Sequence, residues 1–206
     1  MALSDRPIYL ASRSPRRRDL LRQIGVGHEL LLLREDLKRG IDVDEAPHAA
    51  EPPGDYAIRI ALAKARAGLL SMARRAGHLK PLLAADTTVA IDDLIIGKPS
   101  GAEHAVEILA QLSGRSHRVI TAVAVAHGDH VESRVSESVV WMRDVNAEEI
   151  RRYVASGEPL DKAGAYAIQG RAAAFITRIE GSYSGIMGLP LAETVELLRL
   201  FGIDVF

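Results

Sequence analysis

Hydrophobic positions along this chain of 206 residues follow two different periods. Short runs of branched and small apolar residues predict strands at about 8–12, 82–91, 119–126, 131–142 and 173–179. Apolar residues that recur every three or four positions predict helices at about 15–24, 55–76, 102–112, 146–156 and 190–201. Strands and helices therefore interleave, which predicts an α/β fold.

Turn signals between the predicted elements add antiparallel pairing to this picture. Asp92-Asp93 follows a strand and precedes the apolar run 94–97, so it predicts a hairpin, and the segment 127–130 predicts a second one. A sheet that contains hairpins as well as strand-helix-strand units is mixed. We expect residues 115–144 to form a lobe that leans over the rest and leaves a cleft. No low-complexity linker divides the chain, so residues 1–206 are expected to form a single domain.

Composition narrows the functional classes. Hydrophobic residues make up 48% and charged residues 26% of a chain whose net charge is −1, so the broad basic surface of a nucleic-acid binder is not expected. The chain has no cysteine, which excludes disulfides, thiolate zinc sites and a cysteine nucleophile. Its seven histidines show no metalloprotease spacing. Neither a signal-like start nor a long apolar stretch is present, so we expect no membrane segment and a cytoplasmic location.

The segment Ser12–Arg18 combines hydroxyls and arginines at a predicted strand-to-helix turn. Ser14 suits the N-cap and Pro15 the first helical position, so unpaired backbone N–H groups should point out of the turn beside Arg16 and Arg17. Such a turn favours a bound polyphosphate. Three consecutive arginines can also be simply a solvated helix face.

Polar residues inside apolar segments mark further candidates. Asp86 and Thr87 lie in the middle of an apolar strand, where an unpaired carboxylate is costly unless a cation, a metal or N–H donors compensate it. Lys64 lies among alanines and leucines on a helix, so it either extends to solvent or points at an anion. Lys98, between Gly97 and Pro99, is aimed by its neighbours. The competing interpretation for Asp86 is that it has only a structural role.

The segment 158–170 places an acid, a lysine, a phenol and an amide among small residues. The carboxamide of Gln169 offers an acceptor and donors side by side, which complements a pyrimidine edge with N3–H and O4. The acidic loop 42–45 and the segment 181–185 are polar enough to be ordinary solvated loops. His117 is expected to support a loop rather than to catalyse, and Ser182 and Ser184 lack the surroundings of a nucleophile.

Taken in order, several motifs of this chain resemble those of the Maf family of nucleoside triphosphate pyrophosphatases over about residues 7–201. These motifs are Leu10–Arg17, Ala85–Thr87, Gly97–Pro99, Leu112–Gly114 with His117, Lys162–Tyr166 with Gln169, and Gly188–Pro190. Arg13 departs from the family, which frequently has glycine there. The segment 161–170 resembles the branch that acts on dTTP and UTP.

The resemblance implies a Maf/inosine-triphosphatase-like mixed β-sheet with two lobes around a central cleft. It also implies a divalent cation, Mg²⁺ or Mn²⁺, a cytoplasmic location and a homodimer. Asp86 would accept the proton of the attacking water, and Glu45 and Asp86 would hold the metal. Arg16, Thr87 and Gln169 match specificity positions. The full set of substrate-binding residues would be Ser14, Arg16, Arg17, Lys64, Thr87, Lys98, Lys162 and Gln169.

Two other functions compete with this interpretation. A non-catalytic nucleotide sensor that regulates cell division would need the pocket without Asp86. A nucleic-acid-binding module would need a basic surface that the balanced charge does not favour. Release of pyrophosphate separates the first alternative from an enzyme, and salt-dependent binding of oligonucleotides separates the second.

Overall fold

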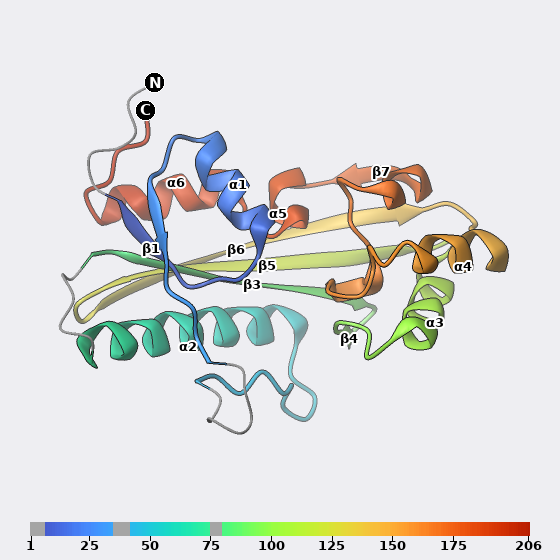
Figure 1. Cartoon of the computed structure of the whole chain (residues 1–206), viewed down its shortest axis with the longest axis horizontal. Coiled ribbons are helices and arrows are strands. Elements are labelled where there is room, and N and C mark those ends of the chain that lie inside the picture. Colours follow the sequence, from blue (N-terminus) through green and yellow to red (C-terminus); the bar gives the residue numbers. More distant parts are fainter. Residues whose placement is uncertain (1–6, 35–41, 75–79) are drawn as a thin grey trace.

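The computed structural model describes residues 7–34, 42–74 and 80–206, which form a seven-stranded mixed sheet between helices (Figure 1). The strand order is β2-β1-β3-β5-β6-β7, with β4 paired to β3. β1 is parallel to both β2 and β3, and the other pairs are antiparallel. The strands are β1 (Ile8–Leu10), β2 (His28–Leu30), β3 (Leu82–Ile91), β4 (Leu94–Ile96), β5 (Ser116–His127), β6 (His130–Met142) and β7 (Ile176–Glu180).

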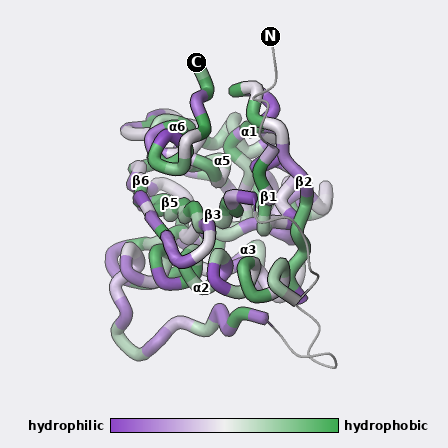
Figure 2. Tube along the Cα trace, turned by 90° about the vertical axis from the view of Figure 1, so that its left-hand side faces the viewer, coloured by the Kyte–Doolittle hydropathy of each residue, from purple (hydrophilic) through white to green (hydrophobic). Residues whose placement is uncertain are grey.

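Helices cover both faces of the sheet (Figure 2). On one face lie α1 (Pro15–Gln23), α5 (Tyr183–Met187) and α6 (Leu191–Leu200), and the long α2 (Pro53–Arg74) lies on the other. At the far end of the long strands lie α3 (Ala102–Leu112), α4 (Ala147–Ala155) and the 3₁₀ turns η1 (Ala163–Ala165) and η2 (Arg171–Phe175). No helix of the described ranges is long and apolar enough to cross a membrane. The sequence-predicted end of the second helix near Gly77 lies outside the described residues.

The alternation of β3 places neighbouring residues on opposite faces of the sheet. Leu83 and Ala85 pack in the core under α1 and α6, whereas Leu82 and Ala84 pack in the core under α2. By the same alternation, Asp86 faces α2 and Thr87 faces α1. β3 therefore presents chemically different side chains to the two faces at one point of the strand.

A gap in the sheet exposes the middle of β3. β1 pairs with β3 only at Leu82 and Leu83, and β4 pairs only with residues 89–91. Residues 84–88 of β3 thus have no strand partner on this side within the described part of the chain. The segment after β1 leaves the sheet at this gap and enters α1, so the loop, the helix N-terminus and both faces of β3 meet there.

The fold class predicted from the sequence is confirmed, but the role given to residues 115–144 is wrong. β5 pairs with β3 over nine residues and with β6 over twelve, so this segment forms the centre of the sheet rather than a separate lobe. The reason is that nearly every residue of β5 is buried, which requires cover on both faces. A separate core under α3 and α4 instead builds the second half of the molecule.

Two smaller predictions are also corrected. The strand expected at 173–179 begins at Ile176, because Ala172 and Phe175, three residues apart, are both buried on one side of the 3₁₀ turn η2. The polar segment after Gly181 contains the short helix α5, whose N-cap Ser182 accepts a hydrogen bond from the Gly185 N–H. The capping box predicted for Asn146 is confirmed. Ser14 occupies the N-cap position of α1, without a side-chain capping bond.

Candidate active site

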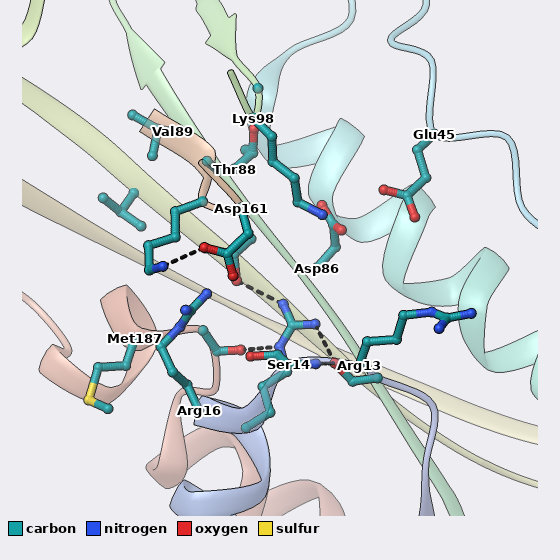
Figure 3. A pocket seen from close by; sticks show the side chains of 18 of the residues that line it. Arg13, Ser14, Arg16, Glu45, Asp86, Thr88, Val89, Lys98, Asp161 and Met187 are labelled. Atoms are coloured by element: carbon teal, nitrogen blue, oxygen red, sulfur yellow. Dashed lines mark hydrogen bonds and ion pairs between the residues drawn. The ribbon is translucent and has the colours of Figure 1, made fainter. Parts of the chain in front are cut away.

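A cavity of about 570 Å³ occupies the gap beside β3 (Figure 3). Its walls come from the β1–α1 turn, the loop before α2, α2 itself, β3, the end of β4, the segment 161–169 and the turn after α5. All ten site residues predicted from the sequence line it, although they are spread over more than 150 positions of the chain: Ser14, Arg16, Arg17, Glu45, Lys64, Asp86, Thr87, Lys98, Lys162 and Gln169.

The cavity is strongly cationic, whereas the chain as a whole carries a net charge of −1. Seven basic and three acidic side chains line it, an excess of four positive charges: Arg13, Arg16, Arg17, Arg34, Lys64, Lys98 and Lys162 against Glu45, Asp86 and Asp161. A polar concavity with this excess focuses its field on small anions. The N-terminus of α1 adds its partial positive charge to the same space.

On the α2 face, Lys64 joins the two carboxylates that the sequence singled out. Its Nζ lies 2.8 Å from Asp86 Oδ1 and 2.9 Å from Glu45 Oε1. The Lys64 and Asp86 side chains are only 15% and 10% exposed, so the pair satisfies the buried carboxylate that the sequence left uncompensated. Tyr56 donates its hydroxyl to the Glu45 carbonyl at 3.0 Å. Burial and the charges of Asp86 and Glu45 raise the pKa of Tyr56 to about 12, so its hydroxyl stays a donor.

On the opposite face, Arg17 connects three elements. Its Nε donates to the Gly188 carbonyl at 2.7 Å, its Nη1 to Ser12 Oγ at 3.1 Å and its Nη2 to Thr87 Oγ1 at 3.0 Å. Burial lowers the pKa of Arg17, and the charge of Asp86 acts in the opposite direction. A guanidinium has five N–H donors, so two remain for a ligand after these three bonds.

The Thr87 hydroxyl has a defined direction. Thr121 donates its hydroxyl to the Gly185 carbonyl at 2.7 Å, and its Oγ1 also lies 3.0 Å from Thr87 Oγ1. The Thr121 hydroxyl has a single proton, which it donates to the Gly185 carbonyl. Thr87 is therefore the donor in the contact between the two threonine hydroxyls. Thr87 also accepts from Arg17, so it offers the cavity only a remaining lone pair.

Among the basic and amide side chains that line the cavity, three have no hydrogen bond or ion pair within the described residues: Arg16, Lys98 and Gln169. Arg16 and Lys98 point into the cavity from opposite sides, one from α1 and the other from the end of β4 (Figure 3). Lys162, by contrast, donates to the Glu158 carbonyl at 2.6 Å and is paired with Asp161. The free groups are therefore concentrated where an anion would enter and at the Gln169 turn.

The cavity also has an apolar lining beside its charged groups. Val89, Ile168 and Met187 line it together with Tyr166, whose ring is buried, and all four pack with the core under α3 and α4. The cavity thus holds cations and carboxylates and also offers apolar surface with a free amide. A ligand with a polyanionic end and a flat, hydrogen-bonding end fits both.

Sequence reasoning missed three residues that line the same cavity. Arg34 follows β2, and because parallel strands share their carboxyl edge, its place beside the β1–α1 turn could have been foreseen. It forms two side-chain hydrogen bonds with Asp42, at 3.0 and 2.8 Å. Tyr56 is eight residues before Lys64 on α2, on the same helical face. Asp161 was noticed only as part of its motif.

The residues present fit a magnesium-like ion. Glu45 and Asp86 already converge on one cationic atom, Lys64 Nζ. Within the described ranges, no three histidine, aspartate or glutamate side chains gather closely enough to form a complete protein cage. Mg²⁺ is commonly held by one or two carboxylates plus substrate phosphates and water, and this pair provides that number of ligands.

Comparisons with known proteins agree with this architecture. A model of the Maf-like protein family matches residues 7–201. The chain is 56% identical to the dTTP/UTP pyrophosphatase of Nitrosomonas europaea over 97% of its length and 96% of the relative's. It is 57% identical to that of Aromatoleum aromaticum over 95% of each chain, and 50% identical to that of Nitrosospira multiformis over 100% of each.

Among solved structures, the Ham1 protein of Staphylococcus aureus superposes with a TM-score of 0.51 at 14% identity, over 95% of this chain and 97% of that one. At this identity the likeness concerns the fold alone. The family match spans nearly the whole chain, and the relatives named above share about half of its residues. This chain therefore belongs to the Maf family.

Proposed function

We propose that this chain is a nucleoside triphosphate pyrophosphatase that converts dTTP and UTP to the monophosphate and pyrophosphate. The observation that carries the proposal is a single cavity that combines an excess of four positive charges with apolar surface and the free amide of Gln169. The names of the relatives at 56% and 57% identity support the choice of dTTP and UTP.

The triphosphate would lie at the cationic end of the cavity. Within the described part of the chain, Arg16 and Lys98 have no hydrogen bond or ion pair, and they enter the cavity from opposite sides, Arg16 from the N-terminal turn of α1. Ser14, Arg17, Lys64 and Lys162 would complete the binding set. An excess of four charges matches the charge of a triphosphate near neutral pH, so binding needs little further compensation.

The base would lie at the apolar end. Val89, Ile168 and Met187 provide surface for a planar ring. The Gln169 amide can accept from N3–H and donate to O4, which uracil and thymine share. Cytosine presents the opposite pattern at this edge, so the same amide would disfavour CTP.

The reaction would be an attack of water on the α-phosphorus. A bond forms between the water oxygen and this phosphorus, the bond to the oxygen that bridges to the β-phosphorus breaks, and pyrophosphate leaves with the bonding electrons. Asp86 would accept a proton of the water, and before an ion binds the Lys64 ammonium at 2.8 Å compensates the charge of this carboxylate. The surrounding cations stabilise charge that accumulates on the phosphoryl oxygens.

We also propose that Glu45 and Asp86 hold Mg²⁺ or Mn²⁺ together with the substrate phosphates. A divalent ion would supply additional charge neutralisation at the phosphoryl group. Since Lys64 contacts both carboxylates, its ammonium would have to turn toward the substrate when the ion binds. Glu45 is well placed for this, because its backbone is fixed by Tyr56 while its carboxylate is 42% exposed.

The experiment is a panel of canonical nucleoside triphosphates incubated with Mg²⁺ or Mn²⁺, in which pyrophosphate is measured. We expect release from dTTP and UTP well above that from CTP, ATP and GTP. Binding of UTP without release of pyrophosphate under either metal would overturn the proposal and favour the nucleotide-sensing alternative.

The remaining expectations from the sequence and from the family resemblance also stay proposals: a single domain over residues 1–206, a cytoplasmic homodimer, and no binding of nucleic acid or membrane. Sedimentation of the purified chain tests the dimer, which would be overturned by a mass of one chain at all concentrations. Salt-sensitive binding to oligonucleotides would contradict the expectation about nucleic acid.

A further inference from the structure

We infer that Tyr153 and Glu158, which lie outside the cavity, are positioning residues that fix Gln169 and thereby set the selectivity among pyrimidine triphosphates. The inference deepens the proposed function and rests on it. It concerns two side chains that the motif comparison did not assign to the site and that do not line the cavity.

Gln169 lies in a tight turn that is closed by a hydrogen bond of its own backbone. The Gly170 N–H donates to the Ala167 carbonyl at 3.0 Å, so Ile168 and Gln169 are the central residues of the turn. Ile168 is 5% exposed and packs in the core under α3 and α4. The turn therefore anchors one central side chain in the core and leaves the other in the cavity.

Tyr153 and Glu158 hold this turn from both sides. The Ala167 N–H donates to Tyr153 Oη at 3.2 Å, and Tyr153 donates its hydroxyl to Glu158 Oε1 at 2.8 Å. The second carboxylate oxygen, Oε2, accepts from the Arg171 N–H at 3.2 Å. One phenol and one carboxylate thus bind the backbone two residues before and two residues after Gln169.

The close approach of Glu158 to the turn depends on Gly170. A Cβ added at this position would overlap the Glu158 carboxylate, so only glycine lets the two come together. The backbone carbonyl of Glu158 also accepts from Lys162 Nζ at 2.6 Å. Glu158 therefore contacts both segments: its carboxylate holds the turn that carries Gln169, and its carbonyl accepts from Lys162.

Tyr153 is the donor in its hydrogen bond with Glu158. Tyr153 is 4% exposed, and its ring packs edge-to-face against Phe175 with centroids 5.4 Å apart. Burial and the neighbouring carboxylate raise the pKa of Tyr153 well above its ordinary value, so its hydroxyl remains a donor. The hydroxyl both donates to Glu158 and accepts from Ala167, which makes it the link between the helix α4 and the turn.

Gln169 itself has no side-chain hydrogen bond within the described residues, so the place of its amide in the cavity depends on the backbone of the turn. Loosening the turn would move the amide out of register with the base edge and would weaken its preference for an edge with N3–H and O4. The phosphate end of the cavity would be unaffected. The expected signature is therefore a change in selectivity rather than a uniform loss of activity.

The experiment compares kcat/KM for UTP and CTP in Tyr153→Phe and Glu158→Gln. The first change removes only the hydroxyl and keeps the ring against Phe175, and the second turns one acceptor oxygen into a donor. We expect the UTP-to-CTP ratio to fall roughly threefold to tenfold in each, the scale of one lost hydrogen bond. Tyr183→Phe, the same change on an exposed tyrosine outside the cavity, should leave the ratio unchanged.

Combination with Gln169→Ala separates positioning from a general structural role. If Tyr153 acts through Gln169, Tyr153→Phe should change the ratio by less than about twofold once Gln169 is absent. An equal loss of kcat/KM for both nucleotides, or a full additional effect in the Gln169→Ala background, would overturn the inference. Thermal melting checks that each variant is folded.

The failure of this inference is distinguishable from the failure of the proposed function. If the unchanged protein releases no pyrophosphate from any triphosphate, the proposed function fails. If it prefers UTP over CTP and both substitutions keep that preference, the proposed function stands and the positioning role of Tyr153 and Glu158 is rejected.

Discussion

At the scale of single residues, Asp86 is a carboxylate only 7% exposed, in an otherwise apolar strand, with an ammonium 2.8 Å away. Pairing with Lys64 explains how its charge is tolerated there. It does not by itself explain why the strand keeps a charge where alanine would pack, since buried ion pairs add little stability compared with apolar residues. The proposed role in proton transfer would account for the charge.

Asp86→Asn tests this role. The amide keeps the shape and removes the proton acceptor, so turnover of UTP should fall by roughly a hundredfold or more. Steady-state release of pyrophosphate from the folded variant is the measurement. Near-normal turnover would transfer the role to another carboxylate, with Glu45 the first candidate.

Gln169→Ala tests base recognition apart from chemistry. Losing the two-way hydrogen-bond pattern should cost roughly 1–3 kcal/mol of transition-state stabilisation for UTP and dTTP. CTP, whose edge inverts the pattern, should lose much less. The measurement is kcat/KM for the three nucleotides, and equal proportional losses across them would show that Gln169 has a structural role only.

The sequence predicts the identity of most site residues because polar groups within apolar segments are informative, as for Asp86 and Lys64. It does not predict how their donors are used. Arg17 and Arg16 are neighbours of the same type, yet three donors of Arg17 bind the protein while Arg16 has no hydrogen bond or ion pair within the described residues. This difference depends on the Gly188 carbonyl, 171 positions away, which no local pattern contains.

At the scale of elements, α1 is anchored to the sheet and to the turn after α5 through Arg17. Its guanidinium bridges Ser12, Thr87 and Gly188, so it holds the cationic turn against β3. Arg16 is one position along the same helix and points into the cavity. Arg16 and Arg17 therefore have the same side chain in different surroundings. The same substitution at each position can be compared directly.

Arg17→Met should lower both stability and activity. Removing three hydrogen bonds from a buried charged group and leaving their acceptors unpaired should reduce the free energy of unfolding by at least about 2 kcal/mol. Arg16→Met should change it by less than about 0.5 kcal/mol and yet lower kcat/KM. Chemical denaturation and steady-state kinetics measure the two effects. Equal stability of the two variants would show that the Arg17 contacts do not anchor α1.

Most helices and strands can be predicted from the sequence because their hydrophobic residues recur with a clear period, as in β3 and α3. The arrangement of these elements in space is harder to predict from the sequence. The run 119–126 indicates a buried strand, but nothing local states whether it lies in the centre of the sheet or in a separate lobe. Pairing with β3 over nine residues decides this, and such long-range register follows from the packing of both faces. The gap that opens the cavity is likewise a consequence of how short β1 and β4 are.

At the scale of the whole molecule, a buried histidine that the proposed chemistry does not use lies beside Tyr166 of the core under α3 and α4. His117 is 2% exposed, and its Nε2 lies 2.8 Å from the Tyr166 hydroxyl. Its Nδ1 is buried without a partner in the described ranges. Burial lowers the pKa of His117 from 6.5 to about 4, so the folded protein keeps this ring neutral. The sequence-based expectation of a supporting role agrees with this position.

This burial predicts an acid-sensitive stability. A lowered pKa in the folded state favours folding above pH 6.5 and less so as the pH falls toward 4, because the unfolded chain takes up the proton first. The shift corresponds to about 3 kcal/mol. Urea unfolding of wild type and His117→Gln between pH 7 and 4 measures it, and the variant should have the flatter profile. Parallel profiles would exclude His117 as the cause.

Glu51 acts mainly at lower pH, and since wild type and His117→Gln share it, its contribution cancels in this comparison. The hydrogen bonds from Arg59 lower its pKa from 4.5 to about 2. A lowered carboxyl pKa favours folding above 4.5, and the contribution is lost only as the pH falls further toward 2. The loop before α2 should therefore remain attached to the helix throughout the range in which His117 titrates.

The central claim is that the cavity directs water to the α-phosphorus of a pyrimidine triphosphate. Hydrolysis of UTP in ¹⁸O-enriched water, followed by mass analysis of both products, tests it most directly. The account predicts one ¹⁸O atom in the monophosphate and none in the released pyrophosphate. Label in pyrophosphate, or formation of orthophosphate and the diphosphate as first products, would contradict it.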